Sequence, residues 1–188
     1  MLIDQDQSLP EVLHQVQQEL KRATADRKHP FRYLVMSTYG EHIRSRYVVL
    51  RAMEEDFKLF IYTDNRSRKI EDLKMQDNLQ LLFYHPKKQV QVILTGKSTI
   101  HEQDSTTAQH WESVKGNARR AYNTVEAPGT VIASPTEGNH WKEEMNDENF
   151  AVIVIEPNAL EVLQLNKSEH LRASFQLQDD WTGKWLVP

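Results

Sequence analysis

The chain has 188 residues and a formal net charge of -4 at pH 7, with 39% hydrophobic residues, 27% charged residues and no cysteine. No stretch approaches the ~20 apolar residues that a membrane-spanning helix needs, and the lack of cysteine excludes disulfides and thiolate chemistry. Because a general nucleic-acid-binding protein carries a basic surplus, we expect neither nucleic acid nor a membrane as a partner.

The N-terminal segment predicts a helix. Ser8-Leu9-Pro10-Glu11 is typical of a capping box, and apolar residues from Val12 to Leu20 recur at helical spacing. We expect this helix to run to about Thr24 and to serve packing rather than chemistry. Residues 1–6 lack the basic and apolar regions of a signal peptide, which favours a cytoplasmic protein.

The middle of the chain alternates turn signals with segments rich in β-branched and aromatic residues, which predicts a meander of strands. One predicted helix, Ser67 to Met75, interrupts the meander. A later strand, Gln89 to Thr95, ends at Gly96, and Ser98 to His101 continue it beyond a bulge. The four earlier predicted strands are Phe31 to Thr38, Arg46 to Met53, Phe57 to Thr63, and Gln80 to Tyr84.

The next segment has mixed signals. Asp104 to Val114 has helical character with a capping residue at its start, and Asn117 to Thr124 predicts a second helix after Gly116. Proline, glycine and charged residues then mark Thr130 to Asn149 as a loop, with room for a short helix near Trp141.

The last part of the chain returns to strands. Two apolar runs, Phe150 to Ile155 and Leu160 to Leu165, are separated by Pro157-Asn158, which we expect to form a turn. Leu171 to Leu177 alternates in part, and Trp181 to Pro188 closes the chain.

Many short strands with few helices predict a mainly β fold, a closed antiparallel β-barrel with peripheral helices. We expect one domain over residues 1–188. Its expected parts are an N-terminal helix in 1–25, barrel strands in 30–101 and 150–188, and a helical and loop insertion in 104–149.

The stretch from Phe60 to Lys69 is the most informative part of the chain. An apolar strand ends at Thr63, a polar turn follows, and Ser67, Arg68 and Lys69 begin the next helix. The free N–H groups and positive dipole at a helix start favour an anion, and two cations there are unfavourable without one. This indicates either a phosphate site or a solvated first turn.

Polar residues on apolar strands extend this hypothesis. Arg46 and Arg51 flank an apolar strand, and their five-residue separation places them on opposite faces if the strand has no bulge. Either one faces a ligand while the other reaches it around the strand end, or only one is functional. Tyr62 offers an aromatic face to a ligand or to packing. Gln91 lies within an apolar strand and needs a partner if buried, although a surface-facing glutamine fits the alternation equally well.

Other common sites are missing from the sequence. It contains no His-Glu-x-x-His motif for a metal, no Gly-x-Ser-x-Gly elbow for a serine nucleophile, and neither a Walker loop nor a Gly-x-Gly-x-x-Gly fingerprint. We therefore expect no metal and assign no catalytic side chain.

Three segments, Ser45 to Arg51, Phe60 to Lys69 and Gln91 to Gly96, resemble in order and spacing the FMN site of pyridoxamine 5'-phosphate oxidase-like proteins. The resemblance spans roughly residues 30–188 and implies an FMN-binding split β-barrel. It places Arg51 where the oxidase usually has lysine, and arginine keeps the charge but changes the geometry. The FMN-binding residues that it implies are Arg46, Arg51, Tyr62, Thr63, Ser67, Arg68, Lys69 and Gln91.

The resemblance also implies a homodimer in which late residues serve the partner's FMN. The oxidase carries Trp-Gln and then Arg-x-His, which grips the substrate phosphate, whereas this chain has Leu163-Gln164 and the order His170-Leu171-Arg172. His170 and Arg172 form either another anion grip for substrate or an exposed pair. The ending Trp181 to Pro188 is similar to a branch of FMN-binding relatives of the oxidase.

The expected function follows from the cofactor. A bound FMN supplies hydride acceptance, and the protein orients it. We expect an FMN-dependent oxidoreductase acting on a small substrate. The alternatives are a non-catalytic flavin-binding sensor or carrier, and a true pyridoxamine 5'-phosphate oxidase.

Overall fold

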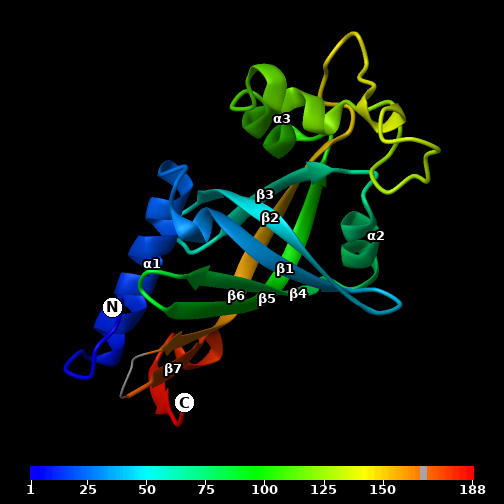
Figure 1. Cartoon of the computed structure of the whole chain (residues 1–188). Coiled ribbons are helices and arrows are strands. Elements are labelled where there is room, and N and C mark those ends of the chain that lie inside the picture. The colour runs from blue at the N-terminus through cyan, green and yellow to red at the C-terminus, as the bar shows by residue number, and fades with distance from the viewer. Residues whose placement is uncertain (166–168) are drawn as a thin grey trace.

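The computed structural model describes residues 1–165 and 169–188 and has a mainly β architecture (Figure 1). Its strands form one antiparallel sheet in the order β3-β2-β1-β4-β5-β6-β7-β8, and pairing of β3 with β6 closes the first six into a barrel. The predicted antiparallel barrel is confirmed. The strands are β1 Tyr33–Tyr39, β2 Ile43–Met53, β3 Leu59–Asp64, β4 Asn78–His85, β5 Val90–Glu102, β6 Phe150–Gln164, β7 Leu171–Gln176 and β8 Gly183–Leu186.

The helices lie around the barrel, as expected. α1 packs against β2 and β8, and its first turn is capped by the Glu11 carboxylate, which accepts a hydrogen bond from the Ser8 N–H at 2.8 Å. In the part of the chain that the structure describes, no helix has the length and apolar character to cross a bilayer. The α-helices are α1 Leu9–Ala25, α2 Arg68–Met75 and α3 Ser105–Trp111, and the 3-10 helices are Pro30–Arg32, Gly116–Tyr122, Glu137–Asn139 and Leu177–Asp179.

The predicted turn at Pro157-Asn158 is wrong, because β6 is one continuous strand of 15 residues. Gly96 of β5 pairs with Pro157 and Thr95 pairs with Ala159, so Asn158 is an extra residue in a bulge. A bulge tolerates proline, which has no N–H to donate to the ladder. A Cβ on Gly96 would lie 2.5 Å from the Glu156 carbonyl oxygen, so the glycine permits this close approach. The register shift does lie at Gly96, where the sequence predicted a bulge, but the extra residue is on β6 and not on β5.

Two hydrophobic cores result from the two faces of the barrel. The larger core is formed by alternate strand residues, such as the fully buried Phe83 of β4 and Phe175 of β7, together with Phe31 of the 3-10 helix Pro30–Arg32. The outer face of β3 and β6 is covered by segment 104–149, which lies with α3 at one end of the barrel, opposite the C-terminus (Figure 1). This second core consists of Phe60, Val114, Tyr122, Phe150, Val152 and Val154.

Candidate functional site

The basic turn folds at the point where β3 leads into α2. Ser67 is the N-cap residue of α2, and its hydroxyl donates a hydrogen bond to the Asp64 carbonyl at 2.7 Å. The Lys69 ammonium folds back and donates to the hydroxyls of Thr63 at 2.9 Å and Ser67 at 3.0 Å. Three of the predicted site residues, Thr63, Ser67 and Lys69, are therefore in direct contact, and Thr63 and Ser67 are buried.

Arg46 joins this group from β2. Its Nη1 donates to the Thr38 hydroxyl at 2.7 Å, and its Nη2 lies 3.5 Å from Oδ2 of the buried Asp72. Asp72 also accepts hydrogen bonds from Thr38 and from Arg44. One carboxylate thus balances two guanidinium groups. We call Arg46, Thr63, Ser67 and Lys69 the inner cluster.

The electrostatics of the inner cluster favour an anion. Burial, together with the positive charge of Arg46, lowers the pKa of Lys69 from its ordinary value, and the negative charge of Asp64 opposes this shift. Burial also lowers the pKa of Arg46, and Asp72 opposes this effect. Lys69 has no ion pair within 4.0 Å among residues 1–165 and 169–188. A bound phosphate would compensate this buried charge and accept a hydrogen bond from the Lys69 ammonium.

Arg68 is placed differently from Lys69. It is the first residue of α2, and its side chain is exposed to solvent. It is next to Lys69 in sequence, but its side chain lies on the surface. Arg68 can therefore contact only a ligand that reaches the start of α2.

Tyr62 and Arg51 lie on the other face of the strands. The Tyr62 hydroxyl shares a hydrogen bond with Nδ1 of His110 at 2.8 Å, and its ring packs on Phe150 at a centroid distance of 5.1 Å. Arg51 sits in a bulge of β2, with its guanidinium 5.5 Å from the centre of the Tyr62 ring. The predicted placement of Arg46 and Arg51 on opposite faces is what the structure has, and the two arginines do not meet.

A cavity of about 280 Å³ opens beside Arg51, and we call it the outer cavity. Burial raises the pKa of Tyr122 in its wall, while the positive charge of Arg51 opposes that shift. Burial also lowers the pKa of His110 behind Tyr62, which favours a neutral imidazole there. The outer cavity is lined by Arg27, Arg32, Arg51, Tyr62, Ser113, Val114, Lys115, Ala118 and Tyr122.

The remaining predicted residues lie on the outer face of the sheet, away from both groups. Gln91 of β5 pairs with Leu163 of β6, which in turn pairs with Arg172 of β7. Arg172 donates to the Glu161 carboxylate at 2.9 Å, and its buried Nε has no hydrogen-bond partner among the described residues. His170 is exposed just before β7. In one chain, these residues do not complete the inner cluster.

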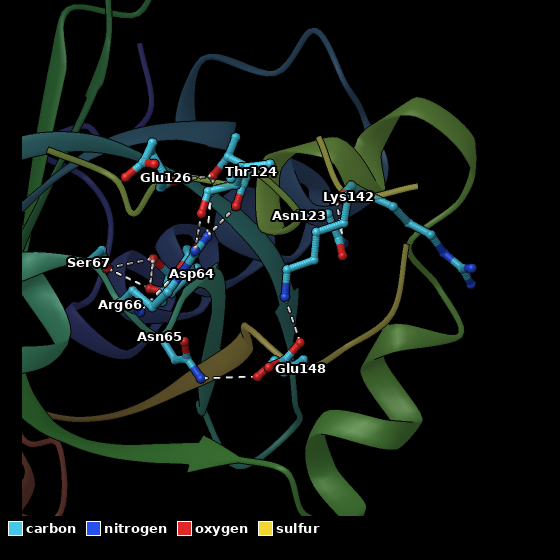
Figure 2. Close-up of polar contacts among 12 residues, drawn as sticks. Asp64, Asn65, Arg66, Ser67, Asn123, Thr124, Glu126, Lys142 and Glu148 are labelled. Carbon is cyan, nitrogen blue, oxygen red and sulfur yellow. Dashed lines mark hydrogen bonds and ion pairs between the residues drawn. The ribbon is translucent and has the colours of Figure 1, made fainter. Parts of the chain in front are cut away.

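Arg66 is a residue that the sequence analysis missed. Its guanidinium forms a bidentate pair with Asp64, at 3.0 Å and 2.7 Å, and donates to the Thr124 carbonyl at 3.0 Å (Figure 2). It also donates to the Val125 carbonyl at 3.2 Å. Asp64 is 4% exposed, and it raises the pKa of Arg66. The turn that begins the inner cluster therefore also holds segment 104–149 in place.

Asn65 strengthens the same attachment. Its side-chain amide donates to the Glu148 carbonyl at 3.2 Å (Figure 2). Its N–H donates to the Asn149 carbonyl at 2.9 Å. In the sequence, Asp64-Asn65-Arg66 gives only a turn signal, because the carbonyls that it binds are distant in the chain. The spacing of an acid and an arginine two residues apart in a turn is the sequence signal that could have predicted their ion pair.

Comparison with protein families finds one match that includes the strands of this site. Residues 13–102 match the family described as "Pyridoxamine 5'-phosphate oxidase, FMN-binding domain". Over these residues the chain resembles the pyridoxamine 5'-phosphate oxidase-like, FMN-binding family, and its fold is that of the split barrel. The match contains all of Arg46 to Gln91 and ends before segment 104–149, so the outer cavity combines family strands with a segment outside the matched region.

Solved structures of the family share the fold. A pyridoxamine 5'-phosphate oxidase-related, FMN-binding protein from Nostoc punctiforme PCC 73102 is 20% identical with a TM-score of 0.76, over 92% of this chain and 96% of that one. PhzG from Burkholderia lata 383, solved in complex with tetrahydrophenazine-1-carboxylic acid, is 19% identical with a TM-score of 0.77, over 98% and 95% of the two chains. Comparison with curated proteins finds no match.

Proposed function

We propose that the chain binds FMN and holds its phosphate at the inner cluster. The observation that carries the proposal is Lys69, a largely buried ammonium whose hydrogen bonds go to two neutral hydroxyls, with Arg46 close enough to lower its pKa. A buried cation of this kind is stable when an anion compensates it. The match of residues 13–102 to an FMN-binding family supports the same ligand.

The protein's part is binding and orientation. The Lys69 ammonium would donate to the phosphate beside the hydroxyls of Thr63 and Ser67, Arg46 would contribute charge, and Asp72 holds Arg46 at the cluster. Arg68 adds charge at the exposed edge. The isoalloxazine ring of a bound FMN supplies hydride acceptance and electron transfer. We infer an oxidoreductase that acts on a small substrate, and the chain's own side chains need supply no nucleophile.

A homodimer is part of this proposal. Three tyrosines on the outer face of the barrel are exposed, Tyr33 at 59%, Tyr47 at 77% and Tyr84 at 47%. Exposed apolar and aromatic side chains gathered on one face are typical of protein contact surfaces. Gln91 and Arg172 lie on this same face, so a second copy there would bring late-chain residues, including His170 and Arg172, toward its neighbour's flavin.

FMN titration of two matched lysine variants tests the cofactor proposal. Lys69→Met removes the buried ammonium, whereas Lys74→Met removes an ammonium of the same helix that pairs with Glu102 at the surface, 54% exposed. We expect the first to weaken FMN binding about ten-fold or more, because a charge-assisted hydrogen bond is worth ~1.5–3 kcal/mol. We expect the second to bind FMN as the wild type does. Equal affinities of the two variants would remove the phosphate from the inner cluster.

A non-catalytic flavin carrier is the second candidate. It is favoured by the departures at the substrate end, where Leu163 stands in place of an aromatic residue and Arg172 is already paired with Glu161. The same departures argue against a true pyridoxamine 5'-phosphate oxidase. Steady-state turnover separates the candidates. FMN-loaded protein that fails to cycle between oxidised and reduced forms with any amine or reductant would contradict the enzyme.

A further inference from the structure

Residues 124–149 form a long loop with little regular structure, and we call them the loop. Within the described residues 124–149, the regular elements are the 3-10 helix Glu137–Asn139 and one bridge between Thr124 and Trp141. Val131 near its middle is 96% exposed. A long loop with few buried contacts opens more easily than barrel strands do, so the groups that fix its ends decide how often it opens.

Three consecutive residues between β3 and α2 hold both ends of this loop. They are Asp64, Asn65 and Arg66, and we call them the corner. Arg66 donates to the carbonyl of Thr124, the first residue of the loop, at 3.0 Å, and Asn65 donates to the carbonyl of Glu148, near its end, at 3.2 Å (Figure 2). The loop is therefore attached to the barrel at one place, from two sides.

Asn123 ties the two ends of the loop to each other. Its side chain is fully buried, its amide donates to the Asn146 carbonyl at 3.0 Å, and its Oδ1 accepts a hydrogen bond from the Asn146 N–H at 3.2 Å. Because the ends are joined in this way, they bind the corner or leave it as one unit.

The corner also supports the inner cluster, through Asp64. The Asp64 carbonyl accepts hydrogen bonds from the Ser67 hydroxyl at 2.7 Å and from the Ser67 N–H at 3.1 Å. The Asp64 carboxylate accepts hydrogen bonds from the Arg66 N–H at 2.8 Å and from its guanidinium at 3.0 Å and 2.7 Å. Ser67 in turn accepts a hydrogen bond from Lys69. One residue thus contacts the inner cluster with its main chain and the anchor of the loop with its side chain.

Two events that order the same residues favour each other. A ligand that binds Lys69 beside Ser67 restricts the Asp64 peptide, and the closed loop restricts the same peptide through Arg66. Once one event has ordered the corner, the other loses less conformational entropy, and each raises the equilibrium constant of the other by the same factor.

We propose that the corner couples FMN binding at the inner cluster to closure of the loop, with Arg66 as the positioning residue. This coupling rests on the proposed function, which makes FMN the ligand of the inner cluster. Tyr122, in the wall of the outer cavity, directly precedes the tie at Asn123. The FMN-loaded chain therefore also has a fixed wall at the outer cavity, and the chain without flavin has one that opens more often.

Hydrogen exchange of the loop amides, with and without saturating FMN, tests the coupling in the wild type and in Arg66→Ala. We expect FMN to slow exchange in the wild-type loop at least about five-fold, and to slow it little in Arg66→Ala. Because the loop is closed in the free chain and coupling is reciprocal, FMN affinity should fall in Arg66→Ala by the same factor.

Lys142→Met is the matched control. It removes an ion pair with Glu148 at 2.6 Å and leaves the hydrogen bonds of the corner in place (Figure 2). We expect this variant to keep the wild-type FMN affinity and the slower loop exchange with FMN. α1 is the internal reference, because a ligand that stabilises the whole chain slows exchange everywhere.

Four results would overturn the coupling. They are unchanged loop exchange in a wild type that binds FMN, equal slowing in α1 and the loop, full protection by FMN in Arg66→Ala, and an equal loss of protection in Lys142→Met. If Arg66→Ala fails to fold, Asn65→Ala decides by the same comparison, since it removes the bond to the Glu148 carbonyl. A wild type that binds no FMN would contradict the proposed function together with the coupling, whereas FMN binding with unchanged exchange contradicts the coupling alone.

Discussion

The two faces of β3 carry positive charge in different ways. On the inner side, Lys69 is held by two hydroxyls and Arg46 is aimed by Asp72, so the donors are ordered before a ligand arrives. On the outer side, Arg51 has a buried Nε without a partner, and the charges around it have no ion pair in the described chain. The donors of the inner cluster are therefore fixed by partners within the chain, whereas the buried Nε of Arg51 is not.

The origin of the two sites differs as well. The inner cluster comes from β2, β3 and the start of α2, all within residues 13–102, where the family match lies. The outer cavity depends on segment 104–149, which packs on β3 through a second core. Because only the outer cavity is lined by segment 104–149, substitutions in the second core should disturb the outer cavity more than the inner cluster.

Phe150→Ala should have the largest effect. Phe150 is fully buried and contacts the rings of Trp111 and Tyr122 at 5.1 Å and 5.0 Å. Removing such a ring costs about 3–5 kcal/mol of unfolding free energy, measured by urea denaturation. Val131→Ala, at a residue 96% exposed, is the control and should change stability by less than about 0.5 kcal/mol. Similar small effects for both variants would mean that the second core does not hold the segment.

Arg66→Ala tests the polar attachment of the same segment. It leaves the buried Asp64 without its bidentate partner and frees the Thr124 carbonyl. We expect a loss of about 1–3 kcal/mol and faster proteolysis within residues 124–149. Arg66→Lys should recover only part of this loss, because lysine cannot form the bidentate pair. Unchanged proteolysis in Arg66→Ala would show that the apolar contacts suffice.

Alkaline pH should weaken FMN binding through Lys69. Its folded pKa is lowered from the ordinary 10.5, so the ammonium needed for phosphate is lost as pH rises through that lowered pKa. The stability of the ligand-free protein should change with pH in the opposite direction to FMN affinity. Between the two pKa values the unfolded chain binds more protons, so unfolding free energy from this group rises with pH. FMN titrations from pH 7 to 10 should show a decline in the wild type that Lys69→Met lacks. A parallel decline in both would assign the effect to another group.

Arg68→Ala should have the smallest effect. Arg68 is exposed, and an ion pair in water contributes about 0–1 kcal/mol. We expect FMN affinity to fall a few-fold, well below the loss in Lys69→Met. A loss as large as that of Lys69→Met would mean that Arg68 closes over the bound phosphate.

Local sequence patterns predicted most of the strands and helix starts. Alternating apolar residues indicated the barrel, and the polar turn before Ser67 indicated the helix start that carries Lys69. The five-residue spacing of Arg46 and Arg51 predicted their separation. The predicted turn at Pro157 was wrong, because the glycine that permits the bulge there lies on a neighbouring strand, more than fifty residues away.

Contacts between distant segments could not be predicted in the same way. Arg66 binds the carbonyls of residues 124 and 125. Because every residue has a backbone carbonyl, the sequence does not show which carbonyls an arginine will bind. Arg27 and Arg32 reach the outer cavity only because α1 ends beside β2. Gln91, His170 and Arg172 are correctly found on strands or their edges, but a single chain does not bring them to the inner cluster, and their roles remain predictions about the dimer.

The most direct test of the central claim compares FMN with riboflavin by flavin fluorescence. The two ligands share the ring and ribityl chain and differ by the phosphate, which the inner cluster is proposed to bind. Several charge-assisted hydrogen bonds of ~1.5–3 kcal/mol predict that FMN binds at least about 100-fold more tightly. Equal affinity for both flavins, or no binding of either, would contradict the account.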